Sequence, residues 1–379
     1  MPLFLALAIN GLGFTALNSA LMVFSLYPLS LGASAVHVGS IIATLYALPL
    51  LLSWTIGVLA GRTSPRWLLT GGTAVGACGA LVPFLFPGLP SLYVAAATIG
   101  LTTACTTVIG QSLIGLLSTP ATRTRNFSNY SMMGSISILV GPPLAGSSID
   151  RFGFPATCAV ISLLLFIGVA GLLAWGKALP RDDTARRLEV NLMATLRDRR
   201  LWGLLAVSAI GQLVTDIFLI FLPMYGHGIG LSATTIGIIV STVAVGSFSV
   251  RLGLVRLVAW FGEARLLAIA LFIGAAAFAL VPLFRHVAPL CMLALAFGLC
   301  GGCTQPLSML MMFNAAPPGR GGEVIGLRMT GNNLARMAGP ALFGGIATAT
   351  GLLAVFWINS VLMAGGGWWA ARRASPGRD

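Results

Sequence analysis

The sequence predicts an all-α membrane protein with 12 transmembrane helices in two pseudo-symmetric six-helix bundles. Of the 379 residues, 57% are hydrophobic and 8% are charged, whereas charged residues make up about 25% of soluble domains. The chain also repeats itself, because residues 39–146 resemble a segment that begins 198 positions later. The matching pairs are Gly39 and Gly237, Gly76 and Gly274, Gly100 and Gly298, Cys105 and Cys303, and Gly141-Pro142 and Gly339-Pro340.

The apolar stretches are long enough to cross a lipid bilayer, which takes about 20 residues per helix. Twelve such stretches lie between charged or turn-rich breaks. We expect them at residues 3–29, 37–60, 67–86, 92–117, 127–148, 155–176, 201–223, 233–257, 266–284, 288–313, 326–348 and 352–371. Ten or eleven spans is the alternative, since some breaks are short. The expected domains are an N-terminal bundle at 1–176, a cytoplasmic linker at 177–200 and a C-terminal bundle at 201–379.

The positive charges gather on one side of the predicted membrane. The formal net charge is +13, but the loops after the odd-numbered spans hold only Arg151 and Arg285. The other side holds Arg62, Arg66, Arg123, Arg125, Arg265, Arg320, Arg372, Arg373, Arg378 and the basic residues of 177–200. This asymmetry places both termini in the cytoplasm and argues against nucleic acid as a partner. Only one of the 22 basic residues is Lys, which is typical of a GC-rich bacterial genome, so we expect a bacterial inner membrane.

Polar side chains recur on one face of several predicted spans, following the helical spacing of three and four residues. Polar groups are costly in lipid, so these faces should line the interior or a water-filled cavity. They comprise Thr15, Asn18 and Ser25 in the first span, Thr103, Thr107 and Gln111 in the fourth, Ser208, Gln212, Thr215 and Asp216 in the seventh, and Thr304, Gln305 and Ser308 in the tenth.

Two charged residues lie deep within predicted spans. A carboxyl group such as that of Asp216 can take up a proton and release it on the other side, so it is either a coupling group or a structural hydrogen-bond acceptor. Arg336 stacks with Asn332 and Arg328 at spacings of four, and its anionic partner is either Asp216 or the substrate.

Three further arginines are predicted towards the inner ends of spans. We expect Arg251, Arg256 and Arg328 to extend towards the inner surface or to cap helix ends there.

The loop after the second span carries a glycine and arginine pattern. Gly57, Arg62 and Arg66 resemble part of the Gly-x-x-x-Asp-Arg-x-Gly-Arg signature of the major facilitator superfamily, although Gly61 replaces the acid. The resemblance implies that these residues belong to a gate on the cytoplasmic side.

The fifth and eleventh spans carry equivalent Gly-Pro segments. Small residues let helices approach closely, and prolines remove backbone donors and bend helices. Gly141, Pro142 and Gly146 are similar to the Gly-Pro motif of the antiporter branches of this superfamily, and Gly339 and Pro340 repeat it. We therefore expect these five residues at helix interfaces.

The resemblance covers the whole chain and implies a secondary active transporter of a small organic solute that works by alternating access. In the superfamily, spans 1, 4, 7 and 10 line the central cavity. The expected substrate or coupling residues are Thr15, Asn18, Thr107, Gln111, Gln212, Asp216, Gln305, Asn332 and Arg336.

An ion- or proton-coupled exporter is the favoured function, because of the Gly-Pro motif. An uptake carrier or facilitator for an organic anion is the alternative. A polytopic membrane enzyme has less support, because His37, His227 and His286 lie near predicted outer loops without catalytic partners. We expect no cofactor and no metal, and a monomer whose partners are a small-molecule substrate, membrane lipid and protons as candidate coupling ions.

Overall fold

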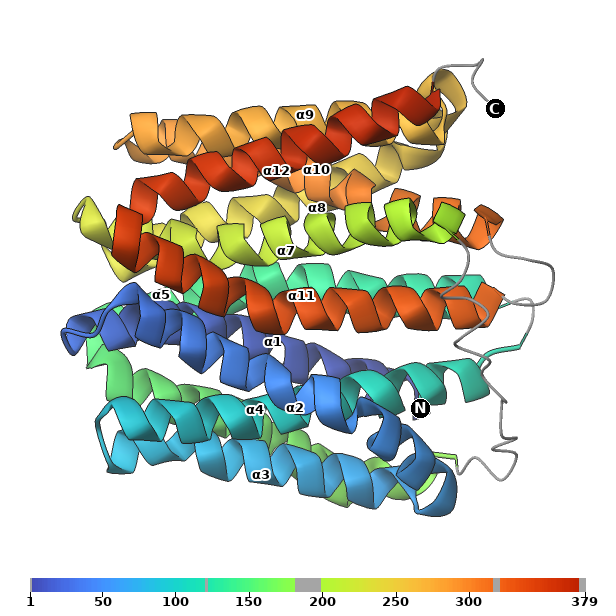
Figure 1. Ribbon diagram of the computed structural model, residues 1–379. Helices are drawn as coiled ribbons and strands as arrows, with labels where there is room; N and C mark the ends of the chain where they lie inside the picture. The colour runs from blue at the N-terminus through green and yellow to red at the C-terminus, as the bar shows by residue number, and fades with distance from the viewer. Residues whose placement is uncertain (1, 120–121, 181–198, 316–320, 375–379) are drawn as a thin grey trace.

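The computed structural model describes residues 2–119, 122–180, 199–315 and 321–374, which form α-helices lying side by side (Figure 1). The helices are α1 (Pro2–Ser30), α2 (Ala35–Arg62), α3 (Pro65–Leu85), α4 (Leu89–Leu116), α5 (Arg123–Trp175), α7 (Arg199–Gly228), α8 (Ala233–Phe261), α9 (Glu263–Leu280), α10 (Val287–Ala315), α11 (Gly321–Thr350) and α12 (Leu352–Ala374). Short 3-10 turns, η1 (Gly176–Ala178) and η2 (Val281–Leu283), follow α5 and α9. Helices satisfy every backbone hydrogen-bonding group within the segment, as a lipid environment requires.

Each of the twelve predicted spans falls on a helix, with ends that differ by a few residues. The helix α5 contains the fifth and sixth spans, and its backbone breaks at Gly153, where φ is +80°. By length and hydropathy, 10 segments of the described chain could cross a membrane. This count takes α5 as one and leaves out α11, which carries Arg328, Asn332 and Arg336.

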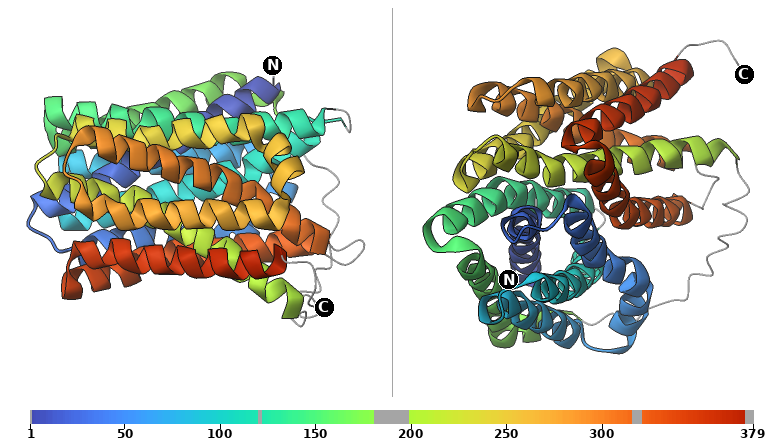
Figure 2. Two further views of the ribbon diagram at one scale, coloured as in Figure 1. Left: turned by 90° about the horizontal axis from the view of Figure 1, so that it is seen from above. Right: turned by 60° about the vertical axis from the view of Figure 1, so that its left-hand side comes forward.

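The helices form two groups that repeat each other. Helices α1–α5 make one bundle and α7–α12 the other (Figure 2), and the bundles meet mainly where α2 packs on α11 and α5 packs on α8. Gly32 and Gly230, which are 198 residues apart, turn the chain into α2 and α8 with φ of +77° and +83°. The predicted fold class is confirmed. The linker at 177–200 lies mostly outside the described residues, so the domain division there stays a prediction.

Four glycines lie at the contact between the bundles, in the equivalent pairs Gly39 and Gly237, and Gly146 and Gly344. A Cβ atom on Gly237 of α8 would lie 2.6 Å from the carbonyl oxygen of Pro142 on α5. A Cβ atom on Gly39 of α2 would overlap the carbonyl oxygen of Pro340 on α11 in the same way. The absence of a side chain therefore allows backbone to meet backbone across the interface.

Asp150, at the end of the first part of α5, binds the start of α8 in the other bundle. Its Oδ1 accepts a hydrogen bond from the Ala233 N–H at 3.0 Å, and its Oδ2 accepts one from the Thr234 N–H at 2.7 Å. A carboxylate at a helix N-terminus satisfies free N–H groups and is stabilised by the helix dipole. The equivalent residue, Thr348, instead donates to the carbonyl oxygen of Gly344 in its own helix.

Because Gly237 lies against the backbone of Pro142, we expect Gly237→Ala to destabilise the protein. Alanine normally stabilises a helix relative to glycine by about 0.5–1 kcal/mol, but Gly237→Ala places a methyl group against Pro142. We expect this overpacking to lower the free energy of unfolding by about 1–3 kcal/mol, measured by unfolding of the purified protein. Gly253→Ala, on the same helix with no atom within 4 Å of the added Cβ, is the control. Equal stability of the two variants would contradict the close contact.

Candidate functional site: a polar cavity between the bundles

A cavity of about 380 Å³ lies between the two bundles and is lined by helices of both. The lining comes from α1, α2, α4 and α5 on one side and from α7, α8, α10 and α11 on the other. Eight of the nine predicted cavity residues lie along it: Asn18, Thr107, Gln111, Gln212, Asp216, Gln305, Asn332 and Arg336. Their part in transport stays a prediction. Within the described chain, no group of His, Cys, Asp or Glu is arranged to hold a metal ion.

Thr15 lies in a different place from the other predicted cavity residues. Its hydroxyl group contacts the carbonyl oxygen of Gly11 at 2.8 Å and the Oγ of Ser137 on α5 at 3.2 Å. Thr15 therefore joins α1 to α5 inside the N-terminal bundle, next to the cavity lining but not in it.

Asp216 and Arg336 form an ion pair at the cavity. The Nε of Arg336 on α11 lies 3.1 Å from the Oδ2 of Asp216 on α7. The Asp216 side chain is 7% exposed and that of Arg336 is 35% exposed. The Arg336 guanidinium also lies 5.6 Å from the ring centroid of Tyr46 on α2, within the range of a cation–π contact. Of the two partners considered for Arg336, the structure therefore has Asp216.

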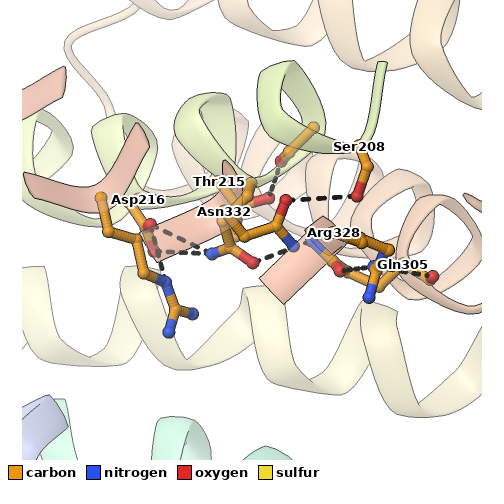
Figure 3. A network of polar contacts seen from close by, with 9 residues as sticks. Ser208, Thr215, Asp216, Gln305, Arg328 and Asn332 are labelled. Atoms are coloured by element: carbon orange, nitrogen blue, oxygen red, sulfur yellow. Dashed lines mark hydrogen bonds and ion pairs between the residues drawn. The ribbon is translucent and has the colours of Figure 1, made fainter. Parts of the chain in front are cut away.

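The ion pair continues into a chain of hydrogen bonds (Figure 3). The Nε2 of Gln212 donates to both carboxylate oxygens of Asp216, at 3.1 and 3.0 Å. The Nε2 of Gln305 on α10 donates to the Oε1 of Gln212 at 3.0 Å, and the Nη2 of Arg328 donates to the Oε1 of Gln305 at 2.6 Å. Side chains of α7, α10 and α11 thus connect Arg336 to Arg328 without interruption.

Two arginines predicted near helix ends line the cavity instead, so the prediction is wrong for Arg251 and Arg328. Arg328 is 5% exposed, and the Nη1 of Arg251 on α8 donates to the Oγ of Ser135 on α5 at 2.9 Å. Arg256 is exposed. The distance of each arginine from the expected end of its span suggested a place at the helix end. Arg328, however, is eight residues before Arg336 and lies on the same face of the helix. That periodicity was the available signal.

Other cavity residues come from helices that the sequence argument did not consider. Tyr46, Tyr130 and Ser247 line the cavity from α2, α5 and α8. The expected lining was limited to spans 1, 4, 7, 10 and 11, and no polar stripe in the remaining spans marked these residues.

The predicted gate residues after α2 are only partly described. Gly57 and Arg62 lie in α2, but the surroundings of their side-chain positions lie outside what the structure describes. The Nη2 of Arg66 donates to the carbonyl oxygen of Leu173 at 2.8 Å. This contact joins α3 to α5 within one bundle, so it does not connect the two bundles.

The Gly-Pro residues divide between two kinds of helix contact. Pro142 and Gly146 of α5 and Pro340 of α11 face the other bundle. Gly141 packs against α1, and Gly339 packs against α7, each within its own bundle. Each of these residues therefore lies at a contact between helices. Their role in gating stays a prediction.

Comparison with known proteins gives a family and a fold. Residues 3–327 and 229–379 match the family model described as Major Facilitator Superfamily. The structure of the nucleoside transporter NupG is 14% identical, with 98% of this chain and 99% of that chain covered and a TM-score of 0.81. A bacterial homolog of the human lysosomal transporter Spinster, in an inward-facing and occupied conformation, is 13% identical, with 98% and 94% covered and a TM-score of 0.78.

A POT family transporter in complex with 5-aminolevulinic acid is also similar, at 12% identity, with 97% of this chain and 94% of that chain covered and a TM-score of 0.81. At such identities the structures are evidence for the fold alone. No curated protein matches the chain at a significant level of sequence similarity.

Because Asp216 and Arg336 form an ion pair, we expect the effects of substituting them on the free energy of unfolding to be coupled. Asp216→Asn and Arg336→Gln should each lower the free energy of unfolding by about 1–3 kcal/mol. Arg336→Gln leaves the buried Asp216 carboxylate without its partner, and Asp216→Asn leaves the partly exposed Arg336 guanidinium without its partner. The double variant should lose less than the sum of the single variants, with a coupling energy of about 0.5–3 kcal/mol. Unfolding of the purified protein measures this cycle, and strictly additive losses would argue against the pair.

Proposed function

Because the chain belongs to the major facilitator superfamily, we propose that it is a secondary active transporter that carries a small organic solute by alternating access. The observation that carries this proposal is the polar cavity of about 380 Å³ between the two bundles. Small-molecule sites typically have volumes of about 300–1,000 Å³. Family and fold favour a transporter over an enzyme.

Asp216 is the residue we assign to ion coupling. It is buried, and it is the acidic residue among the described residues that line the cavity. Its ion pair with Arg336 and its two contacts from Gln212 stabilise the carboxylate form against the cost of burial. Proton binding would weaken the attraction to Arg336, which would then be free to make other contacts in the cavity. A proton can thus change the contacts between helices, as coupled transport requires.

Export is the direction we propose, because the Gly-Pro segment of α5 is similar to that of antiporter branches. Uptake or facilitated movement of an organic anion is the second candidate. It is favoured by the cavity lining, in which Arg251, Arg328 and Arg336 outnumber Asp216. We also propose that the protein resides in a bacterial inner membrane with both termini in the cytoplasm, on the basis of its arginine distribution.

A counterflow screen tests the transport function directly. Purified protein in liposomes is loaded with unlabelled solute, and entry of the radiolabelled solute is followed with and without a pH gradient. Exchange of a solute supports the proposal, whereas chemical conversion of a solute without exchange would favour an enzyme. Inverted and right-side-out vesicles then separate export from uptake.

The coupling role of Asp216 gives a separate prediction. Asp216→Asn cannot take up a proton at this position, so transport driven by a pH gradient should be abolished while counterflow continues. Asp150→Asn alters an acid of α5 that lies outside the cavity and contacts the start of α8, and it should keep the gradient dependence. Uptake and efflux in proteoliposomes measure both variants. Gradient-driven transport by Asp216→Asn at the wild-type rate would refute the coupling role.

A further inference from the structure

The charges that line the cavity are not balanced. Among its described lining residues are Arg251, Arg328, Arg336 and a single acid, Asp216. The Asp216 carboxylate is in contact with Arg336. The described lining therefore carries two more positive than negative charges, a composition suited to a solute of negative charge.

Arg328 is the most deeply buried of these arginines, with 5% of its surface exposed. Its Nη2 contacts the Oε1 of Gln305 at 2.6 Å, the carbonyl oxygen of Gln305 at 3.3 Å and the Oγ of Ser308 at 3.2 Å. All three acceptors are uncharged. Its Nε is buried and has no hydrogen-bond partner within the described chain. A buried guanidinium group whose described partners are all neutral is costly unless an anion approaches it.

The surroundings of Arg328 fit an anion that arrives from the cavity. Asn332, one turn further along α11, also lines the cavity and accepts a hydrogen bond from Ser208 at 3.2 Å. Gln305 approaches Arg328 from α10 and Arg251 adds positive charge from α8 (Figure 3 shows Arg328 beside Gln305). A planar guanidinium group matches carboxylate and phosphate oxygens in geometry and charge.

We propose that the transported solute carries a carboxylate or phosphate group and that Arg328 binds this group in the cavity. The inference rests on the proposed transport function, and it assigns to Arg328 a task separate from that of Arg336. Arg336 already has an acidic partner in the protein, whereas the partners of Arg328 among the described residues are neutral groups that an anionic oxygen can replace.

Binding of matched probes to the full-length protein in detergent tests this proposal without transport. The probes are benzoate with benzamide, gluconate with glucitol, and glycerol 3-phosphate with glycerol, so that each anion has a neutral counterpart. We expect at least one anion to raise the unfolding temperature of the wild-type protein while its counterpart does not. A response to the carboxylates or to the phosphate ester distinguishes the two chemical classes.

Substitutions then locate the binding group. Arg328→Gln should bind the stabilising anion about tenfold more weakly or worse, and Arg328→Lys should fall between this variant and the wild type. Arg256→Gln, which alters an exposed arginine on α8, should bind as the wild type does. Wild-type affinity in Arg328→Gln, equal stabilisation by the neutral probes, or no stabilisation by any anion would each overturn the proposal. If Arg328→Gln does not fold, the matched probes and Arg328→Lys still decide it.

The binding assay and the transport assay can fail independently. Anion binding that depends on Arg328, without any counterflow, would overturn the transport function and leave the anion site. Counterflow of neutral or cationic solutes that persists in Arg328→Gln would overturn the anion site and leave the transport function.

Discussion

The carboxylate of Asp216 is the charge around which the polar residues of the cavity are arranged. It binds Arg336 from α11 and accepts two hydrogen bonds from Gln212 on its own helix. Gln212 is thereby held so that its Oε1 meets Gln305, and Gln305 in turn meets Arg328. A single buried negative charge thus orients side chains on three helices, and its protonation state bears on all of them.

The helices that join the two bundles also line the cavity. In α8, Gly237 lies against Pro142 of the other bundle, and residues from Val243 to Arg251 line the cavity further along. In α5, Gly146 meets the start of α8, and residues from Tyr130 to Ile138 face the cavity. The same two helices therefore carry both the glycine contacts between the bundles and part of the cavity lining. Under the proposed transport function, we expect a solute in the cavity to bear on the relative position of the bundles.

The sequence was sufficient for the fold and for part of the site. Regular spacing between equivalent glycines disclosed the repeat, and the cost of polar groups in lipid selected residues such as Asp216 and Gln305. The sequence was less informative about which way an individual side chain points around its helix axis. Arg328 was placed at a helix end because depth was estimated from span boundaries, whereas tertiary packing turns this side chain inwards. Thr15 lies on the polar face of α1, but its hydroxyl group donates a hydrogen bond to Ser137 of α5 and does not line the cavity.

The contact of Asp150 with the start of α8 breaks the symmetry of the two halves. The seam between α5 and α8 has this carboxylate, whereas the equivalent seam between α2 and α11 has Thr348, which bonds to its own helix. The two seams therefore differ at this position although their glycine contacts match. Parting α5 from α8 at this end requires the two hydrogen bonds of Asp150 to break, whereas the equivalent side chain of α11, Thr348, holds no such bond to α2 within the described chain.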